Sequence, residues 1–143
     1  DEVKQLGWEG AIAGHATDEA AWAALAQRAE AAEAVLIGVF SPIRISKDRS
    51  LLPASLVAPL QALSRRRPTT VVSFSSPFLV AQFPDALGWV LAYGSRPVQI
   101  RAALSALHDG SGLPGRLPVE LPESGLEAPM DETPPPSGGP AFA

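Results

Sequence analysis

The chain has 143 residues, of which 46% are hydrophobic and 18% charged, so it can furnish the core of about one domain. A formal charge of -4 provides no positive field for a phosphate backbone, and we expect no nucleic-acid partner. The absence of cysteine excludes disulfides, thiolate nucleophiles and cysteine-based zinc sites. The longest apolar run, residues 31–40, is too short to span a membrane. Composition leaves the compartment, cytoplasmic or exported, open.

The predicted elements alternate between strand and helix. Residues 1–6 are typical of the last turns of a helix that Gly7 ends, and the β-branched and aromatic runs that follow are typical of strands buried on both faces. We expect a weak strand at 10–13, a helix at 18–34, a strand at 35–40, a helix at 53–66, and strands at 70–74 and 89–93, then a helix after Pro97 with Ile100, Ala103, Leu104 and Leu107 on its apolar side. This order predicts an α/β fold, a three-layer sandwich in which helices flank a mostly parallel sheet.

Composition divides the chain into two parts. Residues 1–122 carry the predicted sandwich domain, and no residues before the helix at 1–6 supply that helix with a first strand. From Glu123 onward the chain is rich in Pro, Gly, Ser and acidic residues, a composition that cannot form a packed core. Residues 123–143 are therefore predicted to be a tail or linker.

Several sequence segments are similar to segments of a known protein family and occur in the same order along the chain. Residues 68–79 (PTTVVSFSSPFL) resemble the family segment VVVSFGSPYLL, and residues 115–122 (GRLPVELP) are similar to GRLPVSLP. Residues 48–53 (DRSLLP) resemble the loop DRxxLxLP, and short matches at 82–85 and 92–94 lie between these blocks. Together they cover residues 35–122 and resemble the flavodoxin-like C-terminal domain of glycoside hydrolase family 3.

The resemblance implies a partner domain. Members of the family have an N-terminal (β/α)8 barrel with an Asp nucleophile, and the sandwich closes one side of a carbohydrate-binding cleft. In the β-glucosidase branch the sandwich adds an acid/base Glu, but residues 41–47 here contain no carboxylate. The chain is thus more similar to the β-N-acetylhexosaminidase branch, whose acid/base His lies on the barrel. We assign no catalytic residue, cofactor or metal to this chain and expect it to be inactive without its barrel.

Other motifs favour structural roles. The segment at 110–115 matches G-x-G-x-x-G, yet it follows a helix and contains Pro114, whereas dinucleotide binding requires a strand, a turn and a helix. We expect a turn here that leads into a closing strand at the GRLP segment, residues 115–118. His15 and His108 lack the neighbours of a catalytic triad or zinc site. Arg65–Arg67 end a helix, where positive charge is favoured by the helix dipole. Arg116 suits a structural bond or an ion pair.

One cluster of charged residues lies at a position where a functional site is expected. Arg44, Lys47, Asp48 and Arg49 follow the strand predicted at 35–40, and open α/β sheets bind ligands at the carboxyl ends of their strands. The alternative is a surface loop in which Asp48 pairs locally. We therefore predict that these four residues contact substrate or the neighbouring domain.

Two functions are consistent with the sequence. The first is an accessory C-terminal domain of a family 3 glycoside hydrolase, of β-N-acetylhexosaminidase type. The alternative is a non-catalytic interaction or scaffold module with the same fold.

Overall fold

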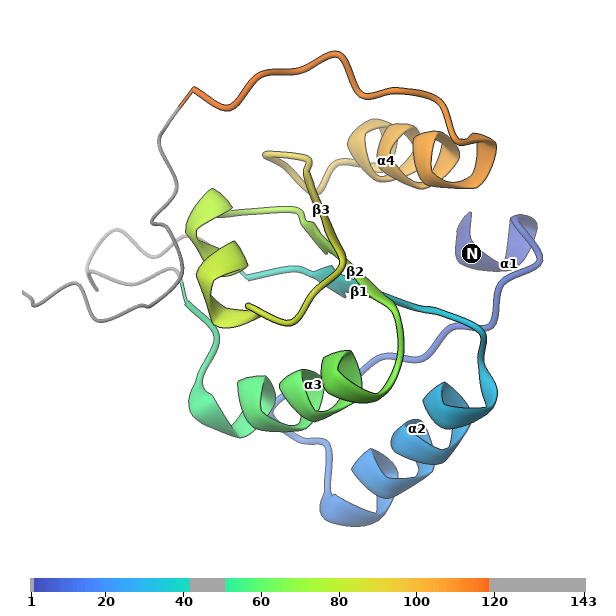
Figure 1. Ribbon diagram of the computed structural model, residues 1–143, viewed down its shortest axis with the longest axis vertical. Coiled ribbons are helices and arrows are strands. Elements are labelled where there is room, and N and C mark those ends of the chain that lie inside the picture. The colour runs from blue at the N-terminus through green and yellow to red at the C-terminus, as the bar shows by residue number, and fades with distance from the viewer. Residues whose placement is uncertain (1, 42–50, 119–143) are drawn as a thin grey trace, which may run out of the picture.

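The computed structural model describes residues 2–41 and 51–118. Its helices and strands alternate along the chain, and Figure 1 shows them in three layers, with α1 and α4 on one side of the sheet and α2 and α3 on the other. In chain order the elements are α1 (Glu2–Gln5), α2 (Glu19–Ala31), β1 (Val35–Val39), α3 (Ala54–Arg66), β2 (Thr69–Ser73), the 3-10 helix η1 (Pro77–Gln82), β3 (Gly88–Leu91) and α4 (Pro97–Asp109). The predicted α/β sandwich is confirmed.

The sheet is parallel and has the order β1-β2-β3 in the described residues. Val35 is aligned with Thr69 across the first pair of strands, and Val71 is aligned with Trp89 across the second. β2 is paired on both edges, and only Thr70 among its five residues is not buried. This central position accounts for its β-branched composition, because both faces of the strand are covered.

The two faces of the sheet have separate cores. On the α3 side, Ile37, Val39 and Val71 pack with Leu79 and Phe83 from the segment around η1. On the opposite side, residues of β2 and β3 pack against α4, chiefly Val72, Phe74, Val90 and Ala103. Each face of β2 therefore contributes to a different core, and the strand joins the two layers.

The predicted helices are correct, with adjusted ends. Asp18 is the N-cap of α2 and accepts a hydrogen bond from the Ala21 amide at 2.8 Å, as its short acidic side chain favours. Pro53 precedes the first turn of α3 as its N-cap. The three arginines at the end of α3 bind neighbours: Arg65 pairs with Asp85 at 3.0 Å, Arg66 pairs with Glu30, and Arg67 donates to the Glu30 carbonyl. These pairs support the predicted surface role.

Two strand predictions were not confirmed. Residues 10–13 form no strand in the structure, and Ile12 is 99% exposed. Residues 111–118 are all exposed and unpaired, so the strand predicted at the GRLP segment is absent from its described part. Glycine and alanine make up three of the four residues at 10–13, and glycine and proline make up half of residues 111–118, so both segments have a low β propensity.

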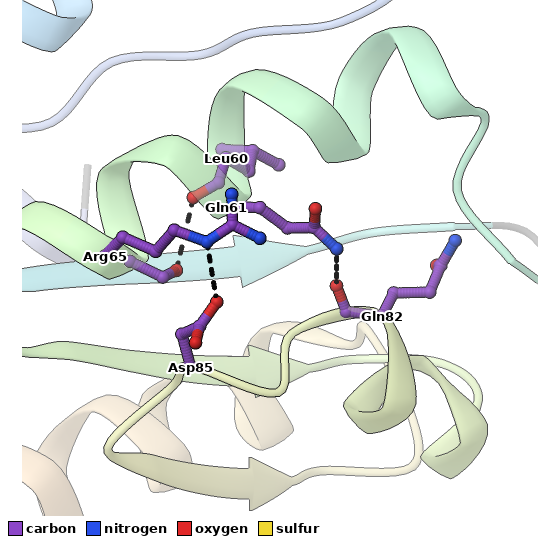
Figure 2. A network of polar contacts seen from close by, with 6 residues as sticks. Leu60, Gln61, Arg65, Gln82 and Asp85 are labelled. Carbon is purple, nitrogen blue, oxygen red and sulfur yellow. Dashed lines mark hydrogen bonds and ion pairs between the residues drawn. The ribbon is translucent and has the colours of Figure 1, made fainter. Parts of the chain in front are cut away.

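A glutamine fixes the entrance to α3. The Gln82 side chain accepts a hydrogen bond from the Leu52 amide and donates one to the Leu52 carbonyl, both at 2.9 Å. Both backbone polar groups of Leu52 therefore have hydrogen-bond partners, as they would beside a neighbouring strand. The Gln82 carbonyl accepts from Gln61 Nε2 at 2.7 Å, and Arg65 Nε donates to Asp85 Oδ2 (Figure 2). These bonds tie α3 to η1 and to the loop after it.

We expect Gln82→Ala to lower the free energy of unfolding by about 1–3 kcal/mol, because it leaves two partly buried backbone groups of Leu52 without partners. Urea denaturation measures this loss. The matched control is Gln27→Ala on the exposed surface of α2, for which the change should be close to zero. Equal effects of the two substitutions would contradict the assigned role of Gln82.

Candidate functional site

The carboxyl ends of the three strands define one edge of the sheet. Because the strands are parallel, the residues after β1, β2 and β3 meet at this edge, where open α/β sheets bind ligands. The segments are Phe40 and Ser41, residues 74–76, and residues 92–96. We call this set the carboxyl edge.

The predicted site residues Arg44, Lys47, Asp48 and Arg49 lie outside the described residues. The structure does describe what holds the chain on each side of them. Before them, the Phe40 ring stacks on Phe74 with centroids 4.5 Å apart and planes at 9°. After them, Leu52 is held by Gln82. The segment that carries the four residues is therefore bounded at its start by the carboxyl edge and at its end by η1.

Three serines shape the turn after β2. Ser73 Oγ donates to the Ser76 carbonyl at 2.8 Å, and Ser76 Oγ accepts from the Phe78 amide at 3.3 Å as the N-cap of η1. Ser75 Oγ is a buried atom with no hydrogen-bond partner among the described residues. This turn lies in the family-like segment 68–79, but the sequence predicted no role for its serines, although the pattern Ser-Phe-Ser-Ser-Pro is typical of a strand that leads into a capped helix.

The turn after β3 contains the one non-glycine residue of the described chain with positive φ. Tyr93 has φ 53°, a left-handed conformation that is unfavourable for a bulky side chain, and its ring is 46% exposed. A Cβ atom at the next residue, Gly94, would overlap the Gln99 side chain. Gln99 Oε1 in turn accepts from the Arg96 amide at 3.1 Å at the start of α4. Glycine at position 94 leaves room for this position of the Gln99 side chain, directly after the left-handed Tyr93.

The described carboxyl edge carries hydroxyl and aromatic side chains and one charged residue, Arg96. Its residues include no aspartate, glutamate or histidine, and the described residues contain no group of three potential metal ligands. His108 lies at the far end of α4 and contacts the Trp8 ring, with centroids 5.7 Å apart. A helix of thirteen residues spans about 20 Å. His108 therefore cannot serve as a base at this edge.

The glycine motif at 110–115 has the structure expected of a turn. Gly110 ends α4 with φ 66°, the left-handed conformation common at helix ends, and Gly112 and Gly115 are exposed. No helix begins after them within the described residues. A pyrophosphate would therefore find no helix N-terminus at this motif.

Comparisons of the chain with protein-family models, with curated proteins and with solved structures found no match. Among the described helices, none has the length and apolar character needed to cross a membrane.

We expect Tyr93→Gly to be more stable than Tyr93→Ala by about 1 kcal/mol, because both remove the ring and only glycine tolerates the left-handed backbone. Urea denaturation of the two variants gives the difference directly. The same pair of substitutions at exposed Ser95 serves as the control, where alanine should equal or exceed glycine in stability. A Tyr93→Ala variant more stable than Tyr93→Gly would contradict the strained turn.

Proposed function

We propose that the chain is an accessory C-terminal domain of a glycoside hydrolase of family 3, of β-N-acetylhexosaminidase type, that packs beside a (β/α)8 barrel. The observation that carries the proposal is the ordered set of family-like segments between residues 35 and 122. In the structure two of these segments, residues 68–79 and 92–94, include the turns after β2 and β3. Both turns are at the carboxyl edge, where a partner domain and a carbohydrate would approach the sheet.

A supporting role follows from what the chain contains. Retaining glycosidases use two groups about 5–5.5 Å apart, and the described carboxyl edge holds no carboxylate or imidazole. A (β/α)8 barrel takes about 250 residues, so a chain of 143 residues cannot include one. Nucleophile and acid/base would both come from the barrel, and the sandwich would shape the cleft. Arg44, Lys47, Asp48 and Arg49 are the proposed contacts to substrate or barrel.

We expect the isolated chain to hydrolyse neither aryl N-acetylglucosaminides nor aryl glucosides, because its described carboxyl edge holds no carboxylate or imidazole to act as nucleophile or acid/base. Release of the aryl group from purified protein measures this. A preparation of Arg49→Ala, made in parallel, reveals contaminating activity, since a contaminant would be equally active in both samples. Turnover that persists through repurification and is lost in the variant would contradict the accessory role.

A non-catalytic interaction module is the second candidate. It is favoured by the exposed aromatic rings at the carboxyl edge, Phe40 at 57% and Tyr93 at 46%, which suit a protein contact as well as a sugar. The coding region that precedes this segment in frame separates the two functions. A barrel with an Asp nucleophile supports the first, and an unrelated domain supports the second.

A further inference from the structure

The outer edge of β1 is uncovered. Val35 donates its amide to the Pro68 carbonyl and Val39 accepts from the Phe74 amide, so alternate residues of β1 bond β2. The amides of Leu36 and Gly38 consequently point away from β2. No strand among the described residues pairs with that edge. Leu36, Gly38 and Phe40 are exposed on the α4 side, an unusual state for a strand of a parallel sheet.

The handedness of the fold indicates what belongs at this edge. The crossover from β1 to β2 uses α3, and α2 contacts α3 on the same side of the sheet. α2 leads directly into β1. Because parallel crossovers are right-handed, a crossover through α2 that ends at β1 begins at a strand on the outer side of β1. The residues that precede α2 are therefore the ones that topology places there.

The segment before α2 is held at both ends. At its start, Gly7 has φ 75° and donates to the Lys4 carbonyl, while Trp8 donates to the Val3 carbonyl, so α1 ends in a fixed turn. At its end, Thr17 closes a turn with Gly14 through bonds of 2.8 and 3.0 Å. Between these turns lies the strap, residues 10–13, which makes no hydrogen bond to the sheet in the described structure.

The strap also runs in the direction that parallel pairing with β1 requires. Glu9 pairs with Arg28 in the last turn of α2 at 3.2 Å, whereas the turn at 14–17 adjoins the first residue of that helix. The strap therefore runs opposite to α2. Since β1 reverses direction after α2, the strap and β1 run the same way, as Figure 1 shows.

A hollow beside α2 matches the side chain that the strap exposes. It has a volume of about 300 Å³ and is lined by Ile12 together with α2 residues that include Ala21, Ala24 and Leu25. Ile12 is 99% exposed, and none of the thirteen residues of α2 is buried. A crossover helix normally covers the strands on either side of it, and α2 lacks that contact on its strap side.

We propose that residues 10–13 close on the outer edge of β1 as a fourth parallel strand, with Ile12 entering the hollow beside α2. The strap would then satisfy the outward amides of Leu36 and Gly38 and bury apolar surface that is now exposed. Because β1 leads straight to Phe40, closure would also steady the start of the segment at the carboxyl edge. The proposal does not depend on the glycosidase assignment.

Amide hydrogen exchange on the full chain, resolved by residue with NMR, tests the strap. We expect the Leu36 and Gly38 amides to exchange at least about tenfold more slowly than in an unstructured peptide. Ile12→Asp should remove that protection, because its carboxylate would lose hydration on closing against α2 and would lie near the Asp18 carboxylate that also lines the hollow, while Ile12→Val should keep it. The Ile37 and Val39 amides, which bond β2, should stay protected in every variant and so report intact folding.

The same NMR exchange spectra provide the control and show the outcomes that would contradict the proposal. Val98→Asp makes an equivalent change at a residue of α4 that is 63% exposed and should leave Leu36 and Gly38 protected. Unprotected Leu36 and Gly38 amides in the parent chain would overturn the proposal. Protection that survives Ile12→Asp, or that rises with protein concentration as a second copy would cause, would overturn it as well.

Discussion

The pairing of β2 on both of its edges holds this fold together. Its backbone hydrogen bonds connect β1 to β3, and its side chains alternate between the core against α3 and the core against α4. Val71 and Val72, adjacent in sequence, are both fully buried in different cores. A change that displaced β2 would therefore loosen both layers at once, whereas a change at β1 or β3 affects a single neighbour.

This arrangement also determines where chemistry can occur. Since the three strands are parallel, their following turns gather at one edge, and local bonds give each turn a defined shape. Serine hydroxyls and a helix cap form the turn after β2, and a strained tyrosine beside Gly94 forms the turn after β3. Phe40 stacks on Phe74 and joins the first turn to the second strand. The described edge thus offers aromatic and hydroxyl surface together with one charged residue, Arg96.

Much of the fold follows from the sequence because its strongest signals are local. Runs of β-branched residues at 35–40 and 70–74 and the leucine spacing of the helix at 53–66 identify buried elements, and the alternation of strands with helices identifies the parallel sheet. The weak strand at 10–13 was not observed, because Gly and Ala leave the outcome to tertiary contacts that the sequence pattern does not encode. The left-handed Tyr93 was also not foreseen. It precedes Gly94, where an added Cβ atom would meet the Gln99 side chain, and a contact of this kind becomes visible only in three dimensions.

The charged residues of the candidate site show a different limit. Their place in the chain after the strand at 35–40 is read from the order of elements, and in the described sheet that strand, β1, is an edge strand. The structure describes Phe40 at the carboxyl edge and Leu52 bound by Gln82, and the four charged residues between them lie outside the described residues. The contacts proposed for them involve a partner surface, which the packing of a single chain does not reveal.

The central claim is that this sandwich serves a catalytic domain without supplying catalytic groups. The most direct measurement compares kcat/KM on an aryl N-acetylglucosaminide for the polypeptide that includes the preceding in-frame region, first intact and then without residues 1–143. The account predicts activity in the intact protein and a marked loss on removal of the sandwich, mainly through a higher KM, because the cleft loses one side. An inactive intact protein, or kcat/KM unchanged by the deletion, would contradict it.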